Sequence, residues 1–297
     1  MKDNTKKISL FVGLTFLLSW SMALLFFARG GQRATSGYLV MTIAYMFTPM
    51  VAAIIVQKLI FHEPLKEPLG IFFKPNRWFL VAWLLPPLLA LATLGVSLLF
   101  PAVTFAPELE AMLERFRPLV TPEQLKQMES QARALPIHPF WVALLQGLIA
   151  GPTINAIAGF GEELGWRGLL QRELRFMGFW RSSLVIGFIW GVWHAPLILK
   201  GHNYPQHPEW GVLMMIAWTM LLSPLFSWVR LQAHSVIAAA ILHGTLNATA
   251  GLSILVVRGG DDLTIGVTGL AGLIVLALMN LGLLIARRRP FGADEPL

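Results

Sequence analysis

The sequence contains no cysteine and few charged residues. The absence of cysteine excludes disulfides, thiolate metal ligands and a cysteine nucleophile, and it leaves the redox compartment open. Charged residues make up 13% of the 297 residues, whereas a soluble domain usually has about 25%. The chain is therefore too poor in charge for an ordinary soluble domain.

Long apolar runs occupy most of the chain. Hydrophobic residues make up 56% of it, and the mean hydropathy is +0.64. A membrane-spanning helix needs about 20 predominantly apolar residues, and backbone polar groups in lipid require helical pairing. We therefore predict a single all-α membrane domain over 1–297, a polytopic transmembrane helical bundle of about eight spans. The expected spans are 8–27, 38–60, 79–100, 140–160, 182–199, 211–229, 235–257 and 264–286, and the fourth is expected to continue as a helix to about residue 176.

The net charge of +7 does not indicate nucleic acid as a partner, because Lys and Arg stand beside the apolar runs rather than in one patch. With the N-terminus inside, fifteen basic residues, including Arg287 to Arg289, fall on the inner side and eight on the outer side. The positive-inside rule then predicts a multi-pass protein of the cell (inner) membrane with both termini cytoplasmic. We interpret the run 8–27 as a retained anchor helix rather than a cleaved signal peptide.

The one long hydrophilic segment is 101–139. It mixes Leu, Met and charged residues at helical spacing around 107–117 and 122–134. We predict an extracytoplasmic loop with short amphipathic helices. A connecting loop is the plain interpretation, and a lid or substrate collar is the alternative. In the outer loop near 200, His202 and His207 are interpreted as solvated residues, with a metal site as the alternative.

Polar residues in membrane segments are costly, at about 2.5–3.5 kcal/mol for a charge, and so indicate function. The first group is Glu162, Glu163 and Arg167. Glu163 and Arg167 are four residues apart and share a helix face, so they can form an ion pair. Glu162 points elsewhere and, beside a second carboxylate, is a candidate general base. A helix end with an ordinary ion pair is the alternative.

Two further groups each contain a histidine. His194 follows Trp190 by one turn in an apolar span, and a core histidine bonded to a carbonyl is the alternative. His243 and Asn247 lie one turn apart on one face. Both can donate hydrogen bonds to one point, which suits an oxyanion. Two polar residues that hold helices together are the alternative for this pair.

These motifs in this order resemble the CPBP (Abi) family of intramembrane proteases, which includes the type II CAAX prenyl endopeptidases and bacteriocin-processing or immunity proteins. The motifs are Glu-Glu-x-x-x-Arg, aromatic-x-x-x-His and His-x-x-x-Asn, on separate predicted helices. The resemblance covers about 140–257, which would be a four-helix catalytic core. Trp190 stands where the family usually has Phe, and another aromatic residue preserves the packing role.

The resemblance implies an endopeptidase without a covalent intermediate. Glu162 and His194 would activate water, His243 and Asn247 would hold the oxyanion, and Glu163 and Arg167 would orient the base. The substrate would be a membrane-associated, prenylated or leader-bearing polypeptide. His-Glu-x-x-His is absent, and we expect no cofactor, although proteins of this kind are often labelled metalloproteases. Zinc held by Glu162, His194 and His243 is the alternative.

The expected topology leaves one difficulty and two competing functions. Glu162 would lie near the inner end of the fourth span and His194 late in the fifth, so their depths disagree unless the fifth helix starts later or tilts. A non-proteolytic immunity or scaffold protein on the same fold is one alternative function. A proton-relaying transporter is the other, but no inverted repeat is seen. The sequence does not indicate the oligomeric state.

Overall fold

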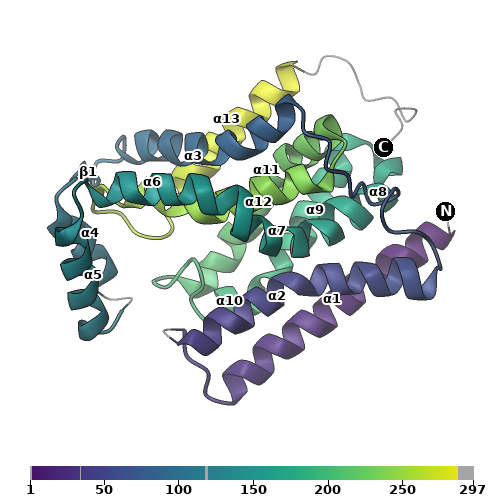
Figure 1. The fold of residues 1–297 in the computed structure, drawn as a ribbon, viewed down its shortest axis with the longest axis horizontal. Coiled ribbons are helices and arrows are strands. Elements are labelled where there is room, and N and C mark those ends of the chain that lie inside the picture. The colour runs from purple at the N-terminus through teal and green to yellow at the C-terminus, as the bar shows by residue number, and fades with distance from the viewer. Residues whose placement is uncertain (1, 34, 118–119, 287–297) are drawn as a thin grey trace.

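The computed structural model describes residues 2–33, 35–117 and 120–286, and these form an almost entirely helical chain (Figure 1). The α-helices are α1 Lys2–Ala28, α2 Ser36–Ile54, α3 Arg77–Ser97, α4 Leu109–Phe116, α5 Pro122–Ala134, α6 Pro139–Ala150, α7 Ala156–Glu163, α8 Gln171–Glu173, α9 Phe179–Trp193, α10 Ala195–Ile198, α11 Pro208–Ala233, α12 Val236–Thr249 and α13 Leu270–Ala286. The remaining elements are the π-helical segments η1 Ile55–Ile60, η2 Gly151–Asn155 and η3 Leu164–Leu170, the 3-10 turns η4 Arg175–Met177 and η5 Ala250–Ile254, and the strands β1 Thr104–Phe105 and β2 Val257–Arg258. The all-α class expected from the sequence is confirmed.

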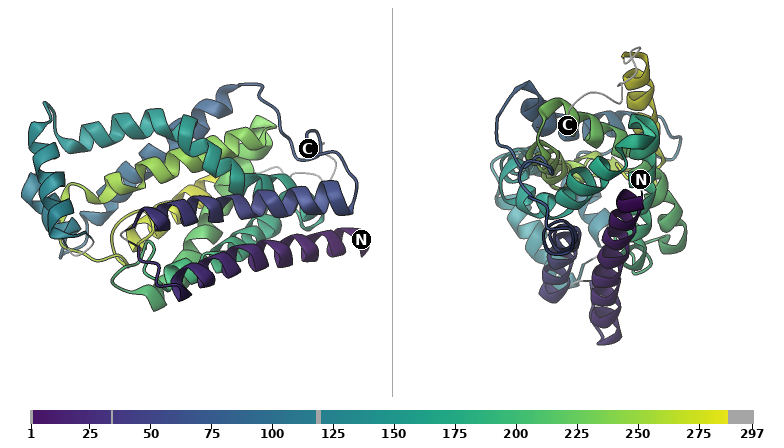
Figure 2. Two further views of the ribbon diagram at one scale, coloured as in Figure 1. Left: turned by 60° about the horizontal axis from the view of Figure 1, so that its bottom comes forward. Right: turned by 90° about the vertical axis from the view of Figure 1, so that its right-hand side faces the viewer.

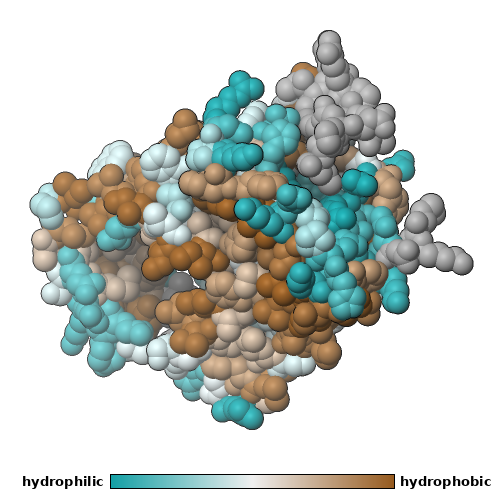
Figure 3. All heavy atoms as spheres, turned by 45° about the vertical axis from the view of Figure 1, so that its right-hand side comes forward, coloured by the Kyte–Doolittle hydropathy of each residue, from teal (hydrophilic) through white to brown (hydrophobic). Residues whose placement is uncertain are grey.

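Six of the described helices are long and apolar enough to cross a membrane. The other two expected spans, 182–199 and 264–286, correspond to shorter helices, α9 with 15 residues and α13 with 17. The count of about eight spans therefore stays a prediction. Large apolar side chains such as Leu17, Leu88 and Ile149 are exposed on the bundle, and hydrophobic residues spread across the middle of the face in Figure 3. Lipid is the solvent that such a surface requires.

Helix α12 lies at the centre of the bundle and contacts α3, α6, α7 and α11. Helices α1 and α2 run side by side on one flank, with α2 also packed on α7. The N-terminus and α8 lie at one end of the molecule, and α4, α5 and β1 lie at the other (Figures 1 and 2). The expected amphipathic helices of segment 101–139 are α4 and α5. Arg287 to Arg289, which were counted among the inner basic residues in predicting the orientation, lie outside the described residues.

One continuous helix of 35 residues, Pro139–Glu173, contains α6 to α8 and two π-helical segments. This continuation beyond the apolar run was expected. The expected depth difficulty between Glu162 and His194 is removed by a direct contact, because Trp190, one turn before His194, donates to Glu162 Oε2 at 2.7 Å. The π-helical segment η3 begins two residues after Glu162, and such widened turns are frequent at functional sites.

Glycine contacts bring α12 against the long helix. A Cβ atom on Gly244 would stand 2.4 Å from the Ala156 backbone nitrogen, and one on Gly159 would stand 2.7 Å from the Ala240 carbonyl oxygen. Small residues of this kind let helix backbones approach closely in membranes. The close approach places His243, next to Gly244, beside the carboxylates of α7.

Candidate active site

Glu162 is buried, with 2% of its surface exposed, and two indole groups hold its carboxylate. The Trp190 Nε1–H donates to Glu162 Oε2 at 2.7 Å, and the Trp166 Nε1–H does so at 3.4 Å. Both bonds engage the same oxygen, so Oε1 stays free for other partners. This geometry fixes the carboxylate and directs one oxygen toward His243.

Glu163 is also buried and lies between a guanidinium and an imidazole. Arg167 Nη1 is 3.2 Å from Glu163 Oε2, which is the i,i+4 pair expected from the sequence. Glu163 Oε1 lies 2.7 Å from His243 Nδ1. An ionised carboxylate only accepts, so Nδ1 is the donor and the ring orientation is fixed.

His243 therefore stands between the two adjacent glutamates. Its second nitrogen, Nε2, is 3.7 Å from Glu162 Oε1. The sequence-based role of Glu163 was to orient the base. In the structure, Glu163 holds His243 directly, while the indoles hold Glu162. A chain of groups thus runs from Arg167 through Glu163 and His243 to Glu162.

Aromatic rings enclose the Arg167 guanidinium and the His243 imidazole. Arg167 Cζ lies 4.7 Å from the Trp190 ring and 4.8 Å from the Phe226 ring. Phe226 also meets His243 edge to face, with 5.7 Å between ring centroids. Such cation–π contacts are strongest when desolvated. Sequence reasoning missed Phe226 and Trp166. Phe226 lies on α11, far from every motif, whereas the i,i+4 spacing of Glu162 and Trp166 was a signal that could have been used.

His194 ends α9 and joins the cluster through Trp190. Its Nδ1 lies 2.8 Å from the Trp190 carbonyl oxygen. The carbonyl only accepts, so Nδ1 carries the proton and Nε2 presents a lone pair. This carbonyl bond is the alternative that the sequence left open for His194. It also fixes the tautomer that a water-binding histidine needs.

Helices α1 and α2 bind the interruption between helices α9 and α10, where His194 lies. The Tyr45 hydroxyl donates to the Trp193 carbonyl oxygen at 2.6 Å, and the Trp20 Nε1–H donates to it at 3.2 Å. The Tyr45 and Trp193 rings also contact each other at an interplanar angle of 42°, with centroids 4.5 Å apart. These partners occupy the carbonyl immediately before His194. The first two helices, which lie outside the segment 140–257 that resembles the protease family, thus position a candidate catalytic residue.

Removing these two donors is expected to lower activity more than stability. Tyr45→Phe and Trp20→Phe each take one hydrogen bond from the Trp193 carbonyl, at a cost of about 1 kcal/mol. The freed carbonyl lets His194 shift, so kcat should fall roughly tenfold while KM changes little. Steady-state kinetics and thermal unfolding in detergent provide the measurement.

Trp83→Phe is the matched control, because the Trp83 Nε1–H also donates to a backbone carbonyl, that of Leu148 at 2.8 Å. Trp83 is not part of the cluster. If Trp83→Phe and Trp20→Phe reduce kcat equally, the positioning role is wrong and the loss reflects stability alone.

Asn247 is the expected site residue that the structure does not bring into the cluster by direct contact. Its side chain is exposed. Among the described residues, it makes no hydrogen bond with Glu162, His194 or His243. It lies one turn beyond His243 on α12, as its spacing requires. Its oxyanion role stays a prediction.

The residues of the zinc alternative do not bring three ligand atoms together in this geometry. The Nδ1 hydrogen bonds of His243 and His194 leave Nε2 of each ring as the atom that could bind a metal. Within the described ranges, three potential ligand atoms come within 4.8 Å of one another only at His207, Asp261 and Asp262. Glu162, His194 and His243 thus do not fit a zinc site as placed, and no chemical step is assigned to a metal.

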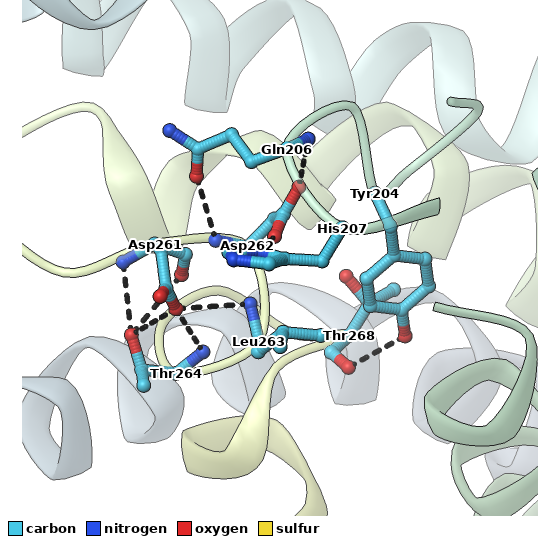
Figure 4. Close-up of polar contacts among 8 residues, drawn as sticks. All are labelled: Tyr204, Gln206, His207, Asp261, Asp262, Leu263, Thr264 and Thr268. Carbon is cyan, nitrogen blue, oxygen red and sulfur yellow. Dashed lines mark hydrogen bonds and ion pairs between the residues drawn. The ribbon is translucent and has the colours of Figure 1, made fainter. Parts of the chain in front are cut away.

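The His207 cluster joins two loops, one before α11 and one before α13 (Figure 4). His207 Nδ1 and the Gln206 backbone N–H each lie 2.6 Å from an oxygen of Asp262. Asp261 Oδ1 accepts from the Leu263 and Thr264 backbone N–H groups. The three side chains are therefore already engaged in joining and capping loops.

The ion pair between His207 and Asp262 makes the junction of these loops pH-dependent. The hydrogen bond to Asp262 raises the pKa of His207 above its usual value. Because the folded pKa is raised, the stabilisation is complete below about pH 6.5 and is lost as pH rises through the raised pKa. Amide exchange at 201–207 is expected to accelerate above pH 7 beyond its intrinsic pH dependence. Asp262→Asn should exchange quickly at every pH, and an unchanged profile in that variant would contradict the assignment.

Comparison with known proteins finds similarity to a family of membrane proteases. Residues 136–249 match a family model described as type II CAAX prenyl endopeptidase Rce1-like. Over 129 residues the chain is 27% identical to CAAX prenyl protease 2 of Methanococcus maripaludis, an alignment that covers 41% of this chain and 46% of that protein. The chain thus aligns with about half the length of this curated relative. The matched segment runs from the start of α6 to the end of α12 and contains all six expected site residues, so the resemblance seen in the motifs is confirmed.

Proposed function

We propose that this protein is an intramembrane endopeptidase that hydrolyses a peptide bond in a membrane-associated polypeptide with water activated by Glu162. Similarity to type II CAAX prenyl endopeptidases supports a membrane protease in general. One observation carries the assignment of the base. A buried carboxylate, held by two indoles through one oxygen, keeps its other oxygen directed toward an oriented imidazole.

The proposed reaction is a direct attack of water on the substrate carbonyl. Glu162 takes a proton from the water while the water oxygen bonds to the carbonyl carbon. The carbonyl oxygen becomes an oxyanion. Glu162 then passes the proton to the leaving nitrogen, the C–N bond breaks, and an acid and an amine are released. No covalent enzyme intermediate forms.

The other site residues are assigned supporting roles. The lone pair on His194 Nε2 holds the attacking water. His243, with a proton on Nε2, and Asn247 donate to the oxyanion. Glu163 orients His243, and Arg167 balances the charge of Glu163. The reaction needs no cofactor in this scheme.

The proposed setting is the cell (inner) membrane, with both termini cytoplasmic and no nucleic acid partner. The relative is named CAAX prenyl protease 2. For this chain we propose the wider class of membrane-associated or leader-bearing polypeptides as substrates.

Cells that carry wild type or Glu162→Gln test this proposal. Proteomic mapping of new peptide termini in membrane fractions should find termini that are present with wild type and absent with the variant. Purified wild type should generate the same terminus in the presence of EDTA. If the two strains give identical termini while a cellular phenotype persists, the protein acts as an immunity or scaffold protein instead.

A further inference from the structure

Helix α1 attaches to the bundle through one narrow stripe of buried residues. Every fourth residue from position 7 to position 23 is buried, and the residues between them are half-buried or exposed. Residues four apart lie one above another on a helix, so they form a single face. The stripe consists of Lys7, Phe11, Thr15, Ser19 and Ala23. The first two have the large side chains of the stripe, and both contact the long helix Pro139–Glu173.

Phe11 packs directly on Trp166, one of the two indoles that hold Glu162. Phe11 is 0% exposed, and its ring meets the Trp166 ring edge to face at 79°, with centroids 5.6 Å apart. A Cβ atom on Gly165 would stand 2.9 Å from Phe11 Cζ, so the tip of the Phe11 ring lies against the backbone of the long helix. The Trp166 Nε1–H in turn donates to Glu162 Oε2 at 3.4 Å. A single residue therefore separates Phe11 from the proposed base.

Trp166 has a second aromatic neighbour, and this one leads to His194. The Trp166 and Trp193 ring centroids lie 5.8 Å apart, and those of Trp193 and His194 lie 4.8 Å apart. Protein interiors are closely packed, so a ring held by several neighbours moves only if one of them gives way. By packing on Trp166, Phe11 restrains a ring that is linked to both groups proposed to handle the water.

Lys7 fixes the position of α1 along the long helix. Its Nζ lies 2.7 Å from Glu63 Oε1 and 3.5 Å from Glu173 Oε1, and its side chain is 5% exposed. Arg172 Nη1 lies 3.2 Å from Glu63 Oε2. Glu173 is the last residue of the long helix, and Lys7 stands one turn before Phe11 on α1. Separating these buried partners would leave uncompensated charges, so the ion pairs hold α1 in one register.

We propose that Phe11 is a positioning residue for hydrolysis, because it holds the Trp166 indole within hydrogen-bond reach of the Glu162 carboxylate. Lys7 keeps α1 in the register that this packing requires. The proposal rests on the proposed endopeptidase function. Phe11 and Lys7 lie outside the segment 136–249 that matches the family model. A helix from outside the matched segment thus completes the candidate site.

Phe11→Leu is expected to lower kcat by about fivefold and to leave KM nearly unchanged, because the space left by the ring lets the Trp166 indole move away from Glu162. Phe79→Leu is the matched control. Phe79 is also buried and meets Phe73 edge to face with centroids 5.6 Å apart, but neither ring belongs to the cluster. This control should lose stability and keep its kcat. Equal losses of kcat in the two variants would overturn the positioning role.

A double-variant cycle shows whether Phe11 acts through the indole N–H. Trp166→Phe keeps an aromatic ring but removes the donor, so it should also lower kcat by about fivefold. In the Trp166→Phe protein, Phe11→Leu should lower kcat by less than about twofold further, because the hydrogen bond that it disturbs is already gone. Losses that multiply fully, or a Trp166→Phe variant with wild-type kcat, would overturn the proposal.

Lys7→Met is expected to lower kcat as well, since α1 loses its ion pair with Glu173. Lys7→Arg keeps a cation at this position and should restore most of the activity. Lys6→Met is the matched control, because Lys6 is the neighbouring lysine on the same helix and is exposed. An equal loss in Lys6→Met, or no rescue by Lys7→Arg, would contradict the role of Lys7.

The packing of Phe11 on Trp166 can also be measured without a substrate. In protein labelled with fluorotryptophan, the fluorine resonance of Trp166 is the one missing from Trp166→Phe. Phe11→Leu should shift or broaden this resonance, and Phe79→Leu should leave it unchanged. A Trp166 resonance that does not respond to Phe11→Leu would overturn the proposal.

The two readouts separate this proposal from the proposed function. Cleavage that depends on Glu162 but proceeds with the same kcat in Phe11→Leu and wild type would refute the positioning role and leave the endopeptidase standing. No cleavage by wild type, together with a Trp166 resonance that responds to Phe11→Leu, would refute the endopeptidase instead.

Discussion

Glu162→Gln is expected to lower the rate of peptide-bond hydrolysis by about 10²- to 10⁴-fold while the protein stays folded. The amide oxygen of glutamine can still accept the Trp190 Nε1–H that now lies 2.7 Å from Glu162 Oε2. Shape and hydrogen bonding are thus retained. Only the ability to take a proton from water is lost, so kcat should fall and KM should change little.

Kinetics on a purified substrate and thermal unfolding in detergent give the measurement. Glu209→Gln is the matched control, because Glu209 is exposed at the start of α11, away from the cluster. It should retain wild-type activity. If Glu162→Gln keeps more than about a tenth of the activity, another group is the base.

Arg167→Met is expected to destabilise the protein by about 3–5 kcal/mol. Arg167 and Glu163 are both buried, with 1% and 0% of their surfaces exposed. Removing the guanidinium leaves the Glu163 carboxylate buried with His243 as its remaining partner. It also removes the stacking on Trp190 and Phe226. The midpoint of unfolding in detergent should fall sharply.

A double variant separates charge from packing. Glu163→Gln with Arg167→Met leaves no isolated charge, so it should be more stable than Arg167→Met alone. Arg133→Met is the surface control. Arg133 pairs with Glu110 and Glu129 but is 57% exposed in its side chain, so its loss should leave the unfolding midpoint unchanged. A double variant as unstable as the single one would assign the loss to packing rather than to charge.

The close contacts within single helices could be predicted from the sequence because they follow from helix geometry. Glu163 and Arg167 are four residues apart, and they pair as the helix period requires. The same rule places Asn247 on the face of His243, but it does not say what that face meets. For this reason the structure leaves Asn247 without a direct contact to the cluster, although its spacing matches the motif.

The partners of the site from distant helices could not be predicted in this way. Phe226 packs on His243 from α11, and Trp20 and Tyr45 fix the carbonyl before His194 from α1 and α2. These residues carry no motif and stand in apolar runs like any other. Their roles depend on how each helix is rotated and how closely its neighbours approach.

The sequence by itself determined the class of the protein, its helical membrane segments and the polar residues within them, because a bilayer penalises every charge and every unpaired backbone group locally. The tertiary structure alone decided which of those residues meet, through glycine contacts such as that of Gly244 with Ala156. It also decided the cavity lined by Arg33 and Arg115, since that hollow exists only where four separate segments come together.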